Sequence, residues 1–397
     1  MTAPLPYLRL IDGMVLRHTG MEVCDVVVEN NKLRIDADAP RGDAVSLSGY
    51  YLLPGIIDLH GDAFEHHIAP RPSAPLPLGM GLAATDREAA SCGVTTAWMA
   101  QSWSWEGGRR GPDFAQEFLA AHQALKPQLA TDLRVQIRCE TYTMDREAQL
   151  IAAVRRYGVD YVIFNNHLDE AIELARDDPG KVADWAARAG RTPQAHMALV
   201  EETLQRSREV PRYLCNLATA FDNLGVKYGS HDDADAHSRE RFAMIGAKVC
   251  EFPMAVTAAA VARAWGDPVL MGAPNVVRGG SQAGKVSAMA LIRDGLCTAL
   301  VSDYHYPSLA QAVFRIFDEG VLPLERAWAL IASHPARIMG LADRGEIEDG
   351  MRADLTIVNK TTRQIEGTIA AGRWSYLAAG LAHRLSLSAD RGRIAAE

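Results

Sequence analysis

The middle of this 397-residue chain alternates between short apolar, β-rich runs and longer runs with the spacing of amphipathic helices. Such alternation is typical of parallel βα units, because a parallel strand reaches its neighbour only through a crossover connection. We predict strands over residues 55–60, 95–100, 133–140, 161–165, 227–231, 249–252, 275–277 and 298–303. Helices are predicted between most of these strands, over 113–125, 146–157, 193–210, 236–244, 255–265, 285–294 and 308–318.

About eight such units over roughly 280 residues favour a closed (β/α)8 barrel of the TIM type over an open sheet. No GxGxxG follows the first predicted strand, which argues against a dinucleotide-binding fold. Both chain ends are also β-rich, with Asp-Gly or Asn-Asn turns between short strands. We therefore predict an α/β protein with a barrel domain over 54–344 and a small β-sandwich domain formed by both chain ends, 1–53 and 345–397.

Composition excludes some classes of function. The net charge of −8 argues against non-specific binding of nucleic acid, which needs a basic surface. The six cysteines lie far apart without a CxxC pair, which argues against a thiolate zinc cluster and suits a reducing compartment. The sequence shows neither a signal peptide nor an apolar run long enough to span a membrane. We expect a cytoplasmic protein that binds neither nucleic acid nor membranes.

Function in a barrel sits at the carboxyl ends of the strands, and ionisable side chains follow several of the predicted strands. The first predicted strand ends in His60-Gly61-Asp62, and the other candidate metal ligands at strand ends are Glu140, His167, His231 and Asp303. Imidazoles and carboxylates in combination suit divalent transition metals such as zinc, manganese or iron. These candidates exceed the needs of one catalytic zinc, and two ions ~3.5–4 Å apart would use them all.

Hydrolysis is the expected chemistry, because a metal-bound water becomes a nucleophile near neutral pH. We expect Glu140 to bridge the two ions and Asp303 to accept the proton of the attacking water. Asp303 and His231 are the candidate catalytic residues. A single histidine at a strand end is more often structural than a ligand, so the prediction depends on the whole set. His167, in Asn-Asn-His, also fits an ordinary turn.

Two stretches resemble the amidohydrolase superfamily. PGIIDLH resembles its first barrel strand, and GEIEDGMRADLTIVN resembles its C-terminal signature. Asp62 stands where the usual His-x-His motif has its second histidine, which is typical of a branch of phosphonate-degradation diphosphatases. Further pieces similar to that branch cover almost the whole chain: LPGIIDLHGDAFEHHIAPRP, IRCE, SHDDAD, EFPMAVTAA, MGAPNVVRGGSQAGKVSA and LVSDYHYPSL.

The resemblance implies metal ligands at the same six positions, with Glu140 in place of the lysine bridge of many superfamily members. It also implies cleavage of a ribose 5-triphosphate with release of diphosphate. The chain departs from the branch at WMAQSWSWEGGRRG and at the His66-His67 pair. The exact substrate, the role of the 103–111 loop and the role of His66 therefore stay open.

A triphosphate needs cationic groups near the metals. Arg71 follows the first predicted strand, and Arg278 ends another in PNVVRGGS. We expect the turn after Arg278 to offer backbone N–H groups to an anion in front of the next helix. The full set of predicted substrate-binding residues is His67, Arg71, Asp232, Arg278, Gly279, Gly280, Ser281 and His305. We expect the histidines on helix-like stretches to be structural or surface residues: His122, His196, His237, His334 and His383.

Two alternatives remain beside the diphosphatase. One is an amidohydrolase that cleaves a C–N bond of a cyclic amide, a dipeptide or an amino-heterocycle. The other is a non-catalytic protein that binds metal or a partner, which leaves the strand-end groups without a role. The expected partner is a small phosphorylated sugar, and a symmetric homodimer is expected because soluble enzymes commonly form such pairs.

Overall fold

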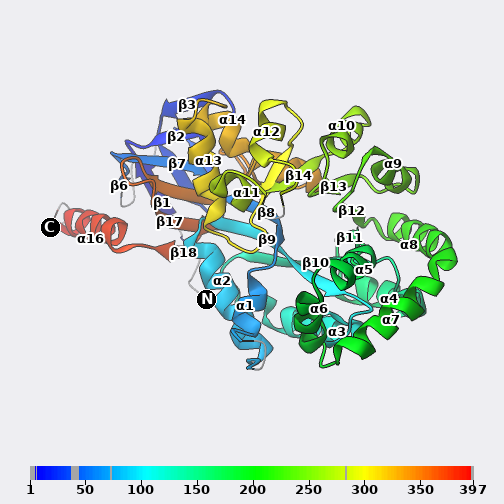
Figure 1. The fold of residues 1–397 in the computed structure, drawn as a ribbon. Helices are drawn as coiled ribbons and strands as arrows, with labels where there is room; N and C mark the ends of the chain where they lie inside the picture. Colours follow the sequence, from blue (N-terminus) through cyan, green and yellow to red (C-terminus); the bar gives the residue numbers. More distant parts are fainter. Residues whose placement is uncertain (1–4, 6, 37–43, 72–73, 282–283, 395–397) are drawn as a thin grey trace.

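The computed structural model describes residues 5, 7–36, 44–71, 74–281 and 284–394 (Figure 1). Its centre is a sheet of eight parallel strands in sequence order from β8 to β15. Their bounds are β8 Ile56–Gly61, β9 Val94–Trp103, β10 Asp132–Glu140, β11 Tyr161–Asn165, β12 Lys227–His231, β13 Val249–Glu251, β14 Val269–Gly272 and β15 Ala299–Val301. The (β/α)8 barrel expected from the alternation is confirmed.

The first and last strands close the barrel at their carboxyl ends. Gly61 forms a parallel bridge with Asp303, whose backbone N–H donates to the carbonyl of His60 at 3.0 Å. The N–H of Asp62 donates to the carbonyl of Asp303 at 2.6 Å. Below this bridge, the buried Asp58 accepts hydrogen bonds from the N–H and hydroxyl of Ser302 at 2.9 and 2.6 Å. Residues far apart in the sequence are thereby fixed next to one another.

Helices surround the barrel and follow the strands in the order of the chain. They are α1 Phe64–Ile68, α2 Leu78–Ser91, α3 Pro112–Leu125, α4 Glu147–Tyr157, α5 Leu168–Asp177, α6 Pro179–Arg188, α7 Pro193–Gln205, α8 Val210–Leu224, α9 Ala236–Met244, α10 Val256–Ala264, α11 Ala273–Arg278, α12 Ala288–Arg293, α13 Ser308–Asp318, α14 Leu324–Ala329 and α15 Ser333–Met339. In α8, Tyr213, Leu217 and Phe221 recur every fourth residue and are buried against the barrel. Gly225, in the left-handed region, ends this helix.

The predicted strand over 275–277 is wrong. These residues belong to α11, and the seventh barrel strand is β14, which the sequence analysis missed. Pro274 lies in the first turn of α11, where its missing N–H costs nothing and its fixed φ suits a helix. The pair Val276-Val277 looks strand-like, but such a short apolar run does not distinguish a strand from a buried helical turn.

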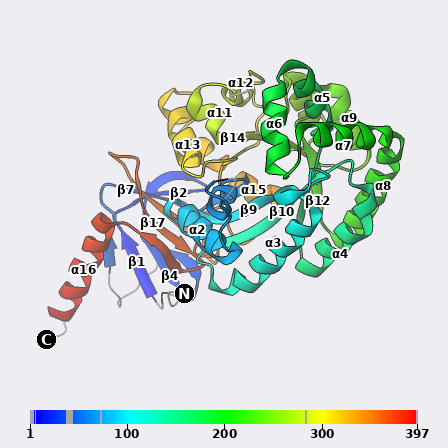
Figure 2. The same ribbon diagram turned by 60° about the horizontal axis from the view of Figure 1, so that its bottom comes forward.

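The two chain ends build two sheets beside the barrel, as Figure 2 shows. One has the order β5-β4-β1-β6 and the other β18-β17-β16-β7-β2-β3. The bounds are β1 Tyr7–Ile11, β2 Met14–Arg17, β3 Gly20–Val23, β4 Val26–Glu29, β5 Lys32–Ile35, β6 Ala44–Ser46, β7 Tyr50–Pro54, β16 Leu355–Asn359, β17 Ile365–Ala370 and β18 Arg373–Leu377. Antiparallel pairing of β7 with β16 joins the two ends, as predicted. The exact domain bounds stay a prediction.

The last helix, α16 Ala379–Ile394, lies on the outer side of the sandwich and was not predicted (Figure 2). Its Leu381 is fully buried in the sandwich core, which combines residues of both chain ends such as Leu10, Val28 and Leu355. None of the helices among the described residues is both long enough and apolar enough to cross a membrane.

Candidate metal centre

His60, at the end of β8, is held in one orientation by a buried carboxylate. Its Nδ1 lies 2.8 Å from Oε2 of Glu251, the last residue of β13. The other oxygen of Glu251 accepts hydrogen bonds from Gln136 at 2.8 Å and from the hydroxyl of Tyr161 at 2.6 Å. Although burial raises the pKa of Glu251, the His60 imidazole lowers it by more, so the net pKa lies below the usual value, and the ionised carboxylate accepts a hydrogen bond from Nδ1–H. Nε2 of His60 is then the ring nitrogen available to a metal. Although burial opposes it, the carboxylates of Glu251 and Asp62 raise the pKa of His60 to about 10, so a metal would replace the proton on Nε2.

Nε2 of His60 faces Asp62. Nε2 of His60 lies 3.6 Å from Oδ1 of Asp62, close to the ~3.3 Å between two ligands of a tetrahedral zinc with bonds of ~2.0–2.1 Å. Oδ1 is buried and has no hydrogen-bond partner among the described residues, whereas Oδ2 accepts from Arg138 at 3.2 Å. An unpaired buried carboxylate oxygen costs free energy unless a cation or water satisfies it. The donor set at this point therefore fits a divalent metal.

His231 extends the same group from the end of β12. Its ring centroid lies 5.3 Å from that of His60, and ligand atoms of His60, His231 and Glu251 all lie within 4.8 Å of one another. Nδ1 of His231 is buried and makes no hydrogen bond within the described chain, although Oδ2 of Asp232 lies 2.8 Å away at a poor angle. Since both oxygens of Glu251 already accept hydrogen bonds, we assign to Glu251 the role of orienting His60. We assign His231 to the set of metal ligands.

A second group of ligand type consists of Glu106, Glu140 and His167, whose ligand atoms also lie within 4.8 Å of one another. Nδ1 of His167 lies 2.5 Å from Oε1 of Glu140, and the N–H of His167 donates to Oε2 at 3.1 Å. Glu106 is fully engaged elsewhere: it accepts from Arg110 with both oxygens at 2.9 Å, and also from Ser104 and Trp185. Glu140 and His167 contact each other through Nδ1 and Oε1, and a metal between them would replace that one contact.

Asp303 follows β15 in a strained conformation. Its φ is +56°, and Asp232 and Phe252 after neighbouring strands have φ of +58° and +49°. Such left-handed residues cost about 1–3 kcal/mol each and persist at sites where the surroundings impose them. Burial, aided by the nearby Asp62 carboxylate, raises the pKa of Asp303 to about 6. The backbone bridge to His60 and Asp62 places Asp303 at the same edge of the barrel as the first group.

The predicted ligands thus lie at one edge of the barrel in two groups. His60, Asp62, His231 and Asp303 are near the first, and Glu140 and His167 make up the second with Glu106. Sequence reasoning missed Glu251, Glu106 and Arg138. Glu251 carries a usable signal, because it lies in the predicted strand 249–252, whereas Glu106 lies in a loop of unknown role. That Glu140 bridges two ions stays a prediction.

In the turn after Arg278, the backbone N–H groups of Gly279 and Gly280 donate within the helix end, and the expected binding of an anion by this turn stays a prediction. Gly279, with φ +86°, is the left-handed cap of α11, and its N–H donates to the carbonyl of Val276. The N–H of Gly280 donates to the carbonyl of Asn275 at 2.9 Å. These groups close the carboxyl end of a helix, where the dipole is negative and repels anions. Arg278 is exposed at this end, and Ser281 follows half-buried.

The remaining predicted substrate contacts lie at the barrel mouth. His67 pairs with Glu88, Nε2 to Oε2 at 2.6 Å, and both line a pocket of about 460 Å³ with His66, Tyr304 and His305. Asp232 directly follows His231, and Arg71 is exposed beyond α1. Whether any of them contacts a substrate stays a prediction.

Comparison with known proteins agrees with this geometry. The sequence profile described as the amidohydrolase family matches residues 82–376. The chain belongs to the amidohydrolase family. Alpha-D-ribose 1-methylphosphonate 5-triphosphate diphosphatase of Escherichia coli (strain K12) is 31% identical over 352 residues, which cover 85% of this chain and 91% of that protein. This amidohydrolase is therefore similar over most of its length to a diphosphatase, as the strand-end motifs implied.

Solved structures show the same fold at low sequence identity. A crystal structure described as an amidohydrolase matches with a TM-score of 0.63 and 12% identity, covering 94% of this chain and all (100%) of that one. The N-acetylglucosamine-6-phosphate deacetylase of Pasteurella multocida matches with a TM-score of 0.62 and 11% identity, covering 93% and 99%. At such identity these similarities concern the fold alone.

Proposed function

We propose that this amidohydrolase releases diphosphate from a ribose 5-triphosphate, and so cleaves a phosphoanhydride bond with the help of divalent metal. The observation that carries the proposal is a pair of buried atoms that make no hydrogen bond within the described residues, Oδ1 of Asp62 and Nδ1 of His231, beside Nε2 of His60. The activity named for the 31% identical relative supplies the substrate class.

We assign one cation to His60, Asp62, His231 and Asp303, and a second to Glu140 and His167, with Glu140 as the bridge. Zinc is the first choice, with manganese or iron as alternatives, because histidine–carboxylate sets accept several metals. A bound divalent ion supplies a Lewis acid and an activated water near neutral pH. Asp303 would accept the proton of that water, since the backbone bridge holds it beside His60 and Asp62.

Two arginines fit the recognition of a polyphosphate. Arg138 is buried at the end of β10 and donates to Asp62, so its positive charge lies directly beside the first group. Arg110 pairs with Glu106 in the loop after β9 and lies beside the second group. A planar guanidinium binds phosphate oxygens in pairs. Arg71, Arg278, Ser281, His67, Asp232 and His305 remain proposed contacts to the rest of the substrate.

Phosphate release tests the proposal. The purified enzyme, stripped by a chelator and reloaded with zinc, manganese or iron, is assayed with added pyrophosphatase on ribose and nucleoside triphosphates. A parallel panel contains cyclic amides, dipeptides and amino-heterocycles. Metal-dependent release from a triphosphate, lost in Asp62→Asn and kept in the exposed control Asp294→Asn, is the expected result. Turnover of an amide with none of any triphosphate would replace the diphosphatase by the C–N hydrolase.

Absence of metal-dependent hydrolysis across both panels would favour the non-catalytic metal-binding alternative. A cytoplasmic location and a homodimer stay predictions. Cell fractionation and light scattering of the purified protein measure them directly.

A further inference from the structure

A cavity of about 580 Å³ lies at the end of the barrel opposite to the metal centre. Its walls come from segments that precede barrel strands, such as Thr298 before β15 and Pro54 before β8, and from the β2–β3 hairpin of the sandwich. The metal ligands follow the carboxyl ends of the same strands, so the barrel itself separates the two places. A volume of this size is in the range of small-molecule pockets.

Arginines from three helices line this cavity: Arg263 lies in the last turn of α10, Arg326 in α14 and Arg337 in α15. Within the described chain, the guanidinium of Arg326 makes no hydrogen bond or ion pair, and that of Arg263 donates only to the carbonyl of Asp267 at 3.3 Å. This arrangement leaves two cations available to an anion.

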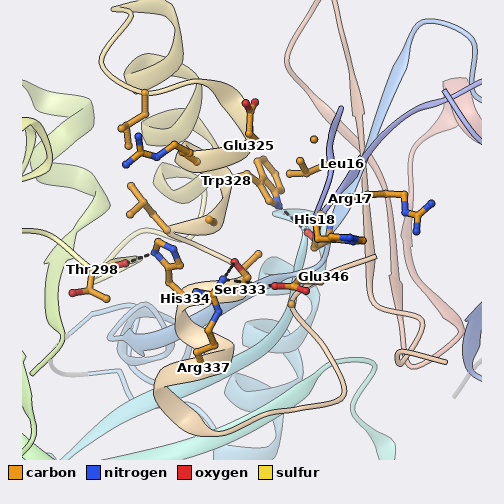
Figure 3. Close-up of a pocket in the computed structure, with 18 of the residues that line it drawn as sticks. Leu16, Arg17, His18, Thr298, Glu325, Trp328, Ser333, His334, Arg337 and Glu346 are labelled. Carbon is orange, nitrogen blue, oxygen red and sulfur yellow. Dashed lines mark hydrogen bonds and ion pairs between the residues drawn. The ribbon is translucent and has the colours of Figure 1, made fainter. Parts of the chain in front are cut away.

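The acidic residues of the lining do not cancel these charges. Glu346 lies 3.6 Å from Arg337 and so compensates that arginine alone. Glu325 stands above Trp328 in Figure 3 and points away from His334. The lining therefore keeps a positive surplus in a chain whose net charge is −8.

His334 lies half-buried among these side chains (Figure 3). Its Nδ1 donates to the carbonyl of Thr298 at 2.8 Å, and its Nε2 has no hydrogen-bond partner in the described part of the chain. Burial lowers the pKa of His334, and the charges of Arg337, Arg263 and Arg326 lower it further. The ring is therefore neutral at pH 7, and Nε2 accepts a hydrogen bond from a hydroxyl group.

We propose that this cavity binds a small hydroxylated organic phosphate, with Arg263 and Arg326 on the phosphate and Nε2 of His334 accepting from a hydroxyl of its body. Arginines supply the fork geometry that phosphate oxygens require, and the imidazole distinguishes a sugar phosphate from inorganic phosphate. The site is separate from the catalytic one and does not depend on which bond the metal centre cleaves.

Calorimetric titration of the metal-loaded enzyme with ribose 5-phosphate and with inorganic phosphate, each up to about 5 mM, tests the proposal. The variants are Arg263→Ala/Arg326→Ala, the milder single change Arg326→Gln, and His334→Asn, whose amide keeps a donor for Thr298 while removing Nε2. Arg155→Ala, an exposed arginine on α4, is the matched control for charge. Thermal melting checks that each variant folds.

We expect the double variant to lose about 100-fold or more in affinity for both probes, since it removes two charge-assisted contacts that are each worth about tenfold or more. His334→Asn should weaken ribose 5-phosphate several-fold and leave inorganic phosphate unchanged. Arg155→Ala should match the natural protein, and the turnover of the double variant should also be unchanged. The proposal would be overturned if Arg326→Gln and the double variant bound both probes as tightly as the natural protein does. It would also be overturned if the natural protein bound neither probe at about 5 mM.

Discussion

At the residue scale, the buried carboxylate of Glu251 decides how His60 is used. By accepting from Nδ1, it fixes the tautomer whose Nε2 faces Asp62, and Gln136 and Tyr161 hold the carboxylate in place. Such partners of a ligating histidine contribute strongly to metal affinity because they orient the ring and raise its basicity. The contact joins residues 191 positions apart, so no local pattern reveals it.

Glu251→Gln should lower the affinity of the first metal about 10–100-fold while leaving the fold intact. The amide keeps the shape of the carboxylate, but one acceptor oxygen is replaced by an NH2 group that cannot accept from the donors around it. Competition with a metal-binding dye measures the affinity. Glu240→Gln, an exposed change on α9, serves as the control. Unchanged metal affinity in Glu251→Gln would remove Glu251 from the support of His60.

Asp303→Asn should reduce turnover by ~10²-fold or more without unfolding the protein, as loss of a general base does. Steady-state phosphate release and a thermal melt of the same preparation provide the two readouts. A turnover equal to that of the natural enzyme would assign the proton transfer to another group.

At the scale of elements, the helical conformation of α11 determines the conformation of the turn that follows Arg278. With α11 a helix, Gly279 becomes its left-handed cap, and Arg315 donates to the carbonyls of Val276 and Val277 at 3.0 and 2.8 Å. The segment after Arg278 therefore completes a helix end, and anion binding by this turn stays a prediction. The requirement for a positive φ at Gly279 can be tested separately from any contact with substrate.

Gly279→Ala should lower the free energy of unfolding by about 1 kcal/mol, because alanine at positive φ is strained. Gly280→Ala is the matched control, since φ there is not positive and an added Cβ meets no atom within 4 Å. Urea denaturation gives the stability of both variants. If Gly279→Ala instead raised KM for a triphosphate at constant stability, that result would support anion binding by this turn.

At the scale of the whole molecule, Asp132 at the start of β10 joins the barrel to the segment that leads into the sandwich. It lies 2.9 Å from Arg344 and 3.6 Å from Arg352, and its neighbour Arg134 adds a contact at 2.9 Å. Although burial opposes it, pairing with Arg134, Arg344 and Arg352 lowers the pKa of Asp132 to about 2. The charge of this carboxylate therefore contributes to stability.

Asp132→Asn should cost about 2–3 kcal/mol of stability at pH 7, because the pKa of about 2 in the folded protein lies well below the ~3.9 of an unperturbed aspartate. The folded pKa lies below the unfolded value of ~3.9, so the contribution is complete above that value and is lost as the pH falls through about 2. Urea titrations at a series of pH values should show the two proteins converging below about pH 4. A difference independent of pH would contradict an ionic origin.

The sequence by itself determined the barrel, the meeting of the two chain ends and the strand-end positions of the ligand candidates. These features follow from the periodicity of apolar residues and from short motifs, both of which can be recognised in the sequence alone. It also placed helices such as α9 and α13 at their observed bounds. Long amphipathic runs carry enough repeats to define their own period.

Only the tertiary structure decided which ligand candidates group together, which carboxylates orient them and where the seventh strand lies. Glu251 and Glu106 take their roles from contacts made across the barrel, and the cavity around His334 forms only where helices from different βα units meet the sandwich. The physical reason is that burial and pairing depend on three-dimensional neighbours, whereas a run as short as Val276-Val277 is compatible with either kind of backbone.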